Sequence, residues 1–358
     1  MKPFIIDAHE DISFNMQVFK RDYSLTLSEV RAKDTLETIQ TTGTSLLSID
    51  EFRKGNIGIV FATLFAAPYN EKTSKSLQFH YRDSNEAYQL IEEQIQLYQQ
   101  LFAQNSASFH PLRNQIDLTQ AISQNPLCTN SPIYLMLSIE GADCVRSLDD
   151  LDYFWKTGVR AIGPAWSRTK FCGGTDEPGG LTPEGHELLK KMNEIGFILD
   201  ISHMDWLAIH QSFDTYEGTI IGSHVNPLEK VPNGTRNRFL PDNLIRKLVK
   251  RDGVMGIIPY NNFIYQYWSL SEKKPLITID HVVEHIDHIC QLAGNSRHVG
   301  IGSDFDGGFG AELTPDGINS VADLQLIGDK LFQKGYTSND VENILSQNWL
   351  RILRQCLP

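Results

Sequence analysis

Short apolar runs that end in a histidine or a carboxylate recur along this chain, and they constrain its fold more than any other feature. Residues 199–203 read Leu-Asp-Ile-Ser-His, and residues 220–224 read Ile-Ile-Gly-Ser-His. Buried strands of a parallel sheet have such apolar runs, because helices cover both faces. Since the two runs are a helix-length apart, we expect neighbouring barrel strands that direct His203 and His224 towards one point.

The same pattern can be followed through the whole sequence. It predicts eight strands, near residues 4–9, 57–65, 133–140, 159–166, 197–203, 219–224, 254–260 and 298–304. Helical patterns separate most of them, near residues 28–33, 49–54, 76–103, 111–123, 148–156, 182–193, 206–213, 242–251, 279–293, 320–334 and 338–354. Alternating strands and helices indicate a parallel sheet, and eight strands indicate a closed barrel. We predict an α/β fold, a (β/α)8 TIM-type barrel with extra helices, with residues 1–358 in a single domain.

Residues of metal-ligand type follow five of the eight predicted strands: His9, Asp11, Glu140, His203, His224 and Asp304. Each has an ordinary structural interpretation on its own, such as an exposed strand terminus for Glu140. Barrels of this class place their active sites at the C-terminal ends of the strands. Because buried polar groups need partners, the set as a whole predicts a metal site there.

Three imidazoles and three carboxylates suit zinc or a similar cation. Six groups are too many for one tetrahedral site, so we expect two ions that share a carboxylate bridge. Two cations lower the pKa of a bridging water, so that hydroxide forms near neutral pH, and they polarise a carbonyl for attack. A carboxylate near that water can take up the proton and deliver it again.

Composition excludes several other classes of function. The net charge is −12 and no block of Lys and Arg stands out, which argues against nucleic acid or anionic membranes as partners. No apolar stretch approaches the length of a membrane span, and residues 1–9 lack the apolar core of a signal peptide. We expect a cytoplasmic protein, monomeric or homodimeric. The cysteines lack paired spacing, which is typical of a reducing compartment; they are Cys128, Cys144, Cys172, Cys290 and Cys356.

Two further motifs have alternative interpretations. His281, His285 and His288 recur at helical spacing, and we interpret them as part of a solvated outer helix, because no strand end supports a metal face there. Residues 304–307, Asp-Phe-Asp-Gly, imitate the aspartate motif of haloacid-dehalogenase-type phosphatases. That motif normally opens a fold, whereas only about fifty residues remain after it here. A metal-binding barrel without catalysis is a third alternative, against which the intact Asp304 argues.

Nine sequence blocks extend the pattern beyond the strand ends. They lie at residues 6–11, 138–141, 158–160, 181–185, 199–203, 222–224, 238–242, 299–307 and 347–351. With these blocks, collinear over nearly the whole chain, the sequence resembles the renal (membrane) dipeptidase family within the amidohydrolase superfamily. The blocks that contain His203, His224 and residues 302–307 are together highly specific.

The resemblance implies a zinc-dependent dipeptidase with a binuclear site. By position, His9 and Asp11 would bind one Zn²⁺, His203 and His224 would bind the other, and Glu140 would bridge the two. Asp304 would be the acid/base group, so that Asp304 and Glu140 are the expected catalytic residues. Other divalent metals are an alternative to two Zn²⁺ per chain.

The resemblance also implies substrate contacts. Arg238 falls where the family places an arginine for the substrate carboxylate, and Arg236 lies so close that it is an alternative. Trp166 occupies a position where members such as the renal enzyme have a histidine that is thought to stabilise the tetrahedral intermediate. Tryptophan can donate one N–H but cannot become cationic, which changes the contact to the oxyanion. Tyr260, at the end of a predicted strand, completes the expected contacts.

The expected reaction is hydrolysis of a dipeptide by metal-bridging hydroxide, with an arginine on the free carboxylate. Dipeptides with a C-terminal D-residue are plausible substrates, because family members tolerate them. The alternative is a binuclear amidohydrolase that acts on another small amide, an N-acyl amino acid or a lactone.

Overall fold

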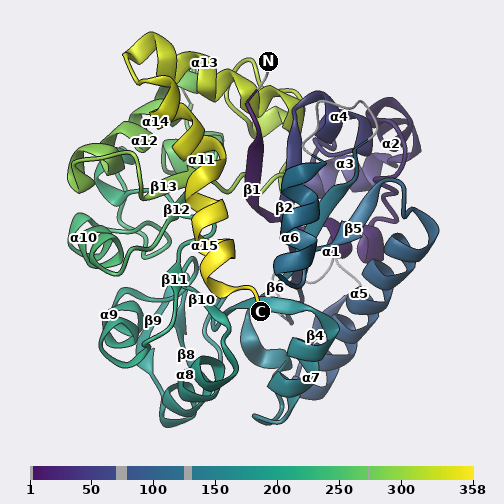
Figure 1. The fold of residues 1–358 in the computed structure, drawn as a ribbon, viewed down its shortest axis with the longest axis vertical. Coiled ribbons are helices and arrows are strands. Elements are labelled where there is room, and N and C mark those ends of the chain that lie inside the picture. The colour runs from purple at the N-terminus through teal and green to yellow at the C-terminus, as the bar shows by residue number, and fades with distance from the viewer. Residues whose placement is uncertain (1–2, 70–78, 125–130, 273–274) are drawn as a thin grey trace.

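The centre of the molecule is a barrel of eight parallel strands (Figure 1). This computed structural model describes residues 3–69, 79–124, 131–272 and 275–358. The strands follow one another around the barrel in chain order: β1 Ile5–Glu10, β2 Ile57–Phe65, β6 Ile133–Glu140, β7 Val159–Gly163, β10 Ile198–Asp200, β11 Ile220–Ile221, β12 Met255–Ile257 and β13 Val299–Ile301. A bridge between Gly222 and Met255 joins β11 to β12 and closes the ring. The predicted (β/α)8 barrel is confirmed.

Helices surround the barrel. They are α1 Ile12–Val18, α2 Leu27–Lys33, α3 Leu36–Thr42, α4 Ile49–Lys54, α5 Ser84–Gln104, α6 Gln115–Ser123, α7 Asp150–Thr157, α8 Pro183–Ile195, α9 Trp206–Thr215, α10 Asp242–Lys250, α11 Asn261–Ile264, α12 Ile279–Ala293, α13 Gln325–Lys334, α14 Ser338–Glu342 and α15 Asn348–Cys356. Short 3₁₀ turns lie at Ala142–Cys144, Leu228–Lys230, Trp268–Leu270, Ala311–Leu313 and Val321–Leu324, and Asn343–Gln347 forms a π-helical turn.

Several boundaries differ from the sequence prediction. The helix predicted at 111–123 begins only at Gln115, because residues 109–111 form a strand, β5 Phe109–Pro111, beside β6. The helix predicted at 76–103 begins at Ser84, after β4 His80–Tyr81, which pairs with β3 Ala67–Pro68; residues 76–78 lie outside the described part. Between β7 and α8, where no strand is predicted, the chain forms an antiparallel hairpin, β8 Cys172–Gly174 and β9 Glu177–Leu181.

The later barrel strands end sooner than predicted, and Asp200 shows the physical reason. Its carboxylate accepts the backbone N–H groups of Ser202 and Ser223, at 3.1 and 3.0 Å. Those amides therefore bond to a side chain instead of continuing a strand ladder. As a result, His203 and His224 lie on the loops just beyond β10 and β11 rather than within the strands.

The N-terminal end of the barrel is closed by the last helix, α15, which crosses the front of Figure 1. Trp349 is fully buried there, with its ring 5.4 Å from that of Phe61. Its indole N–H donates to the carbonyl of Ile301 at 3.0 Å. Inward-facing residues from the first halves of the strands pack with α6 and α15 into one apolar cluster. Polar chemistry is thereby confined to the opposite, C-terminal end.

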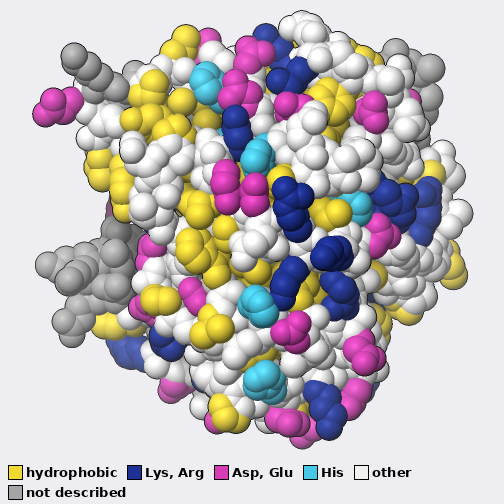
Figure 2. Space-filling view, turned by 90° about the vertical axis from the view of Figure 1, so that its left-hand side faces the viewer, with side chains coloured by type: hydrophobic (Ala, Val, Ile, Leu, Met, Phe, Trp, Pro, Cys, Tyr) yellow, Lys and Arg dark blue, Asp and Glu magenta, His cyan; other side chains and the backbone are white. Residues whose placement is uncertain are grey.

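Acidic and basic side chains are intermixed on the face that Figure 2 shows. Across the described residues, no helix combines the length and the apolar character that crossing a membrane would require. Cys144, Cys172, Cys290 and Cys356 are free thiols, and Cys128 lies outside the described residues.

Candidate metal centre

An irregularity in β1 sets the direction of His9. Residues 7–10 of β1 lie opposite residues 60–62 of β2, so β1 contains one extra residue there. Ala8 packs in the cluster inside the barrel. Because side chains alternate between the two faces of a strand, His9 would point outwards if Ala8 points inwards. The extra residue shifts this alternation, so the residues after it point to the other face. The His9 ring reaches the barrel mouth, with Nε2 3.4 Å from Oγ1 of Thr63.

Glu140 lies at the centre of the site. Regular alternation along β6 places Tyr134 and Met136 in the barrel interior, and Glu140 continues the same face at the strand end. Glu140 Oε1 is 2.8 Å from Nε2 of His203 and 3.2 Å from Nε2 of His224. These two imidazole nitrogens are 3.0 Å apart. One carboxylate oxygen therefore meets both histidines.

The first strand supplies the other half of the site. Nε2 of His9 is 3.8 Å from Oε2 of Glu140 and 3.9 Å from Oδ1 of Asp304. At the barrel mouth, two overlapping groups could each hold a metal ion, His9 with Glu140 and His224, and His9 with Asp11 and Asp304. These groups contain five of the six residues predicted from strand ends, and His203 joins them through its 2.8 Å contact with Glu140.

A second layer of polar residues, which the sequence did not identify as functional, orients the two histidines. Nδ1 of His203 is 2.9 Å from Oγ1 of Thr175, and Nδ1 of His224 is 2.8 Å from Oγ of Ser223. Ser223 in turn donates to the carboxylate of Asp200. Partners on Nδ1 leave Nε2 free for a ligand. The available sequence signal was the Asp-x-Ser motif at residues 200–202, which begins with the last residue of β10.

Asp304 owes its position to an unusual backbone. Its φ is +59°, in the left-handed region, where strain is often found at functional sites. The third residue after it must be small: a Cβ on Gly307 would lie 2.1 Å from Oδ1 of Asp304. Asp306 anchors the same loop, since it accepts hydrogen bonds from Tyr23 and Ser45 at 2.7 and 2.8 Å. The Asp-Phe-Asp-Gly motif at residues 304–307 therefore follows the last barrel strand. Since the same motif opens the fold of the phosphatases, its place here excludes that alternative.

The electrostatics of the site call for cations. Burial raises the pKa of the Asp11, Glu140 and Asp304 carboxyls well above their usual range, and each is raised further by another of these carboxylates. Burial also lowers the pKa of His9 to about 3, so its imidazole is neutral and able to bind a metal. Asp11 Oδ1 is buried without a hydrogen-bond partner among the described residues. This donor set fits divalent metal ions.

The two arginines play different parts. Arg238 is 1% exposed, and it donates through Nη1 to the carbonyl of Ser202 at 3.0 Å. Its Nε and Nη2 have no partner among the described residues, although both are strong donors. Arg236 forms a two-pronged ion pair with Asp176, at 2.9 and 2.6 Å. Arg238 is therefore the arginine whose unpaired N–H groups could bind a substrate carboxylate.

A cavity of about 440 Å³ opens over these residues. It lies in the size range of small-molecule sites, roughly 300–1,000 Å³. Asp11, Glu140, His203 and Asp304 form part of its lining, together with both arginines and Trp166. Tyr260 is not among the lining residues; its ring stacks on that of Phe309 at 4.2 Å.

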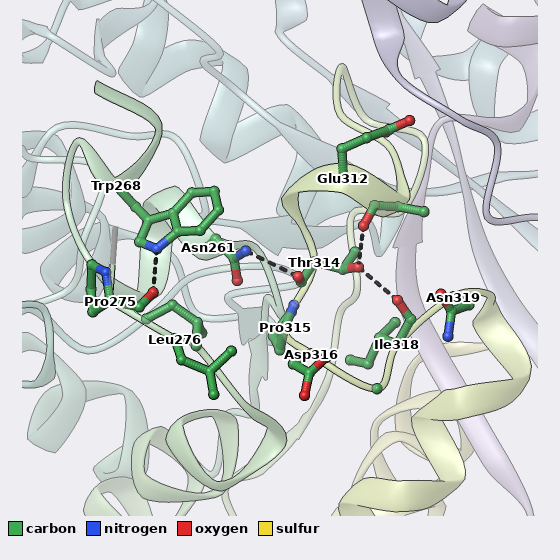
Figure 3. A pocket seen from close by; sticks show the side chains of 13 residues that line it. Asn261, Trp268, Pro275, Leu276, Glu312, Thr314, Pro315, Asp316, Ile318 and Asn319 are labelled. Atoms are coloured by element: carbon green, nitrogen blue, oxygen red, sulfur yellow. Dashed lines mark hydrogen bonds between the residues drawn. The ribbon is translucent and has the colours of Figure 1, made fainter. Parts of the chain in front are cut away.

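A second cavity, of about 360 Å³, lies between the loops that follow β12 and β13 (Figure 3). Asn261 donates there to the carbonyl of Thr314 at 3.0 Å. Of the two carboxylates in its lining, Glu312 accepts a hydrogen bond from the backbone N–H of Thr44 at 3.0 Å. Its lining contains no histidine or cysteine among the described residues, so the metal-type chemistry belongs to the barrel mouth.

The three histidines of α12 do not meet at one metal site, although His288 belongs to a partly exposed group with Glu229 and Asp242 that could hold a cation. His281 accepts a hydrogen bond from the backbone N–H of Thr278 at the helix start, at 3.1 Å. His288 lies 2.7 Å from a carboxylate oxygen of Asp242. The helix is an outer one as predicted, but the solvated interpretation is wrong for His285, which is 1% exposed. It packs inwards because the apolar face of the helix includes its position.

Comparison with known families decides the class of this protein. The sequence model of the family described as membrane dipeptidase (peptidase family M19) matches residues 2–357. The chain belongs to this family. It is thus a dipeptidase of the M19 metallopeptidases, a hydrolase, as the sequence resemblance predicted.

The chain is also similar to other proteins over most of its length. A protein of Klebsiella pneumoniae described as uncharacterized is 29% identical over 74% of this chain and 95% of its own length. A protein of Schizosaccharomyces pombe described as an uncharacterized dipeptidase is 27% identical, over 85% and 71%. A Rhodobacter sphaeroides metallopeptidase, crystallised with a phosphinate mimic of the dipeptide L-Ala-D-Ala, has the same fold; its TM-score is 0.80 at 19% identity, covering 99% of this chain and 100% of that one.

Gly307→Ala tests the packing that positions Asp304. We expect dipeptide hydrolysis to fall by about two orders of magnitude, because the new methyl group displaces the Asp304 carboxylate. Gly335→Ala is the control: nothing lies within 4 Å of its added Cβ, although its φ of +100° strains an alanine. The control variant therefore carries a backbone penalty of about 1–2 kcal/mol, visible in urea unfolding, which Gly307→Ala does not share. Equal activity of the two variants would contradict the role of Gly307.

Proposed function

We propose that this dipeptidase uses two divalent cations, zinc by preference, in the mouth of the barrel. His9, Asp11 and Glu140 would hold one ion, and Glu140, His203 and His224 would hold the other. The observation that supports this most directly is the contact of one buried Glu140 carboxylate with histidines on both sides. Nitrogen and carboxylate ligands in this proportion suit zinc.

The cations, when bound, would make water a stronger nucleophile near neutral pH and polarise the scissile carbonyl. Asp304 accepts the proton of the attacking water and delivers it to the leaving amine as the C–N bond breaks. Its position within 3.9 Å of His9 Nε2 brings it beside the same centre. Arg238 holds the C-terminal carboxylate through its free Nε and Nη2 groups.

We further propose that dipeptides with a C-terminal D-residue are accepted. The Rhodobacter sphaeroides metallopeptidase that shares this fold carries a mimic of L-Ala-D-Ala. An N-acyl amino acid is the second candidate substrate class, since Arg238 recognises a carboxylate and an acyl amide presents the same scissile bond. A panel of dipeptides and N-acetyl amino acids, assayed with added zinc, separates the two. Turnover of the N-acetyl compounds alone would contradict the dipeptide assignment.

Asp304→Asn tests the proton transfer. We expect kcat to fall by about 10²–10⁴-fold, the usual contribution of a positioned acid or base, because the amide cannot accept the proton. Zinc content, measured on the same samples by elemental analysis, separates this effect from loss of metal. Asp316→Asn, which alters an exposed carboxylate of the loop after β13, is the control. Full activity of Asp304→Asn would refute the proposed role.

Arg238→Met tests carboxylate binding. We expect KM for dipeptides to rise about 10- to 100-fold, the value of a charge-assisted hydrogen bond. Dipeptide amides lack the carboxylate, so they should show a much smaller change, and this ratio is insensitive to the amount of folded enzyme. Arg236→Met is the matched control and should affect KM less. If the Arg236 variant alone raised KM, the assignment would be reversed.

A further inference from the structure

One side of the catalytic cavity is formed by three aromatic side chains, Phe14, Phe65 and Trp166, here called the aromatic wall. The rings of Phe14 and Phe65 are 5.3 Å apart, and those of Phe65 and Trp166 are 5.2 Å apart. Aromatic rings at such distances pack favourably. The three rings therefore form a continuous apolar surface.

The aromatic wall lies beside the centre of the site. In the β2–β6 pair, Phe65 is directly opposite Glu140, so their side chains emerge next to each other at the barrel mouth. Trp166 follows β7, the strand on the other side of Glu140, and its ring centre is 6.3 Å from that of His203. A group attached to a carbonyl at this centre would meet the wall.

Arg238 lies on the opposite side of the barrel mouth. Its guanidinium is 5.0 Å from the ring of Phe263, which belongs to α11 after β12. The aromatic wall instead follows β1, β2 and β7. A dipeptide with its carboxylate on Arg238 and its scissile carbonyl near Glu140 thus directs its N-terminal residue towards the wall.

We propose that the aromatic wall selects dipeptides whose N-terminal residue has a large, uncharged apolar side chain. This inference rests on the proposed function, because it takes the position of the scissile bond from the metal centre and Arg238. Phe14 and Phe65 are 9% and 8% exposed, whereas Trp166 is 38% exposed. A leucine or phenylalanine side chain would remove more of the tryptophan ring from water, which stabilises the bound state.

The charges around the cavity disfavour dipeptides with a charged N-terminal side chain. Asp176 and Arg236 neutralise each other at the rim, and the carboxylates of Asp11, Glu140 and Asp304 face the proposed cations. Among the described lining residues, no further charged side chain is left for a lysine or aspartate at the N-terminal position. Burying such a group without a partner is costly.

The test compares kcat/KM for X-Ala dipeptides, with X being Leu, Phe, Ser, Asp or Lys, on the zinc-loaded enzyme. We expect Leu and Phe to exceed Asp and Lys by about 10- to 100-fold. Phe65→Ala and Trp166→Ala should each reduce the Leu-to-Asp ratio by about 10-fold. Trp166→Glu, at a partly exposed position that tolerates a charge, should raise Lys-Ala relative to Leu-Ala. Phe332→Ala, on the exposed face of α13, should leave the ratios unchanged.

The outcomes separate the two proposals. If the wild-type enzyme hydrolyses all five dipeptides at similar kcat/KM, or prefers Asp or Lys, the role of the aromatic wall is refuted while the dipeptidase mechanism stands. If the Leu preference survives both Phe65→Ala and Trp166→Ala, another surface provides it and this inference is again refuted. If the zinc-loaded enzyme hydrolyses no dipeptide, the proposed function fails, and the inference fails with it.

Discussion

Negative charge buried at the mouth of the barrel is the constraint on which the rest of the site depends. Asp11, Glu140 and Asp304 are each at most 8% exposed, and the deeply buried guanidinium of Arg238 offsets the charge of Glu140 and Asp304 only. Removing a carboxylate from water costs several kcal/mol unless a partner compensates. Neutral imidazoles supply lone pairs but no positive charge. Divalent cations would balance these charges, and the geometry leaves the carboxylates and imidazoles in place to receive them.

The scaffold holds these groups in position against their mutual repulsion. The carboxylate of Asp200 gathers the backbone amides after two strands, which ends both strand ladders and fixes the loops that carry His203 and His224. Asp306 ties the loop that carries Asp304 to the connections between the N-terminal helices, through Tyr23 after α1 and Ser45 after α3. Because α15 seals the other end of the barrel, substrate can approach only over the metal side.

Sequence patterns predicted most of this architecture, and the reasons are local. Continuous apolar runs marked the strands, and ligand-type residues after five of the eight strands marked the site, because parallel barrel strands end at a common face. The extra residue in β1 left no such signal, yet it determines that His9 points inwards. The choice between Arg236 and Arg238 also required coordinates, since it depends on Asp176, some sixty residues away, engaging one guanidinium. Phe14 and Phe65 resemble ordinary core residues in the sequence, and only the strand register places Phe65 opposite Glu140.

The central claim is that one carboxylate, Glu140, joins two metal ions in this barrel. Anomalous diffraction from crystals grown with zinc, recorded on both sides of the zinc absorption edge, tests it most directly. Our account predicts two zinc peaks on either side of Glu140, one beside His9 and Asp11 and the other beside His203 and His224. A single peak, or peaks remote from Glu140 in zinc-saturated crystals, would contradict it.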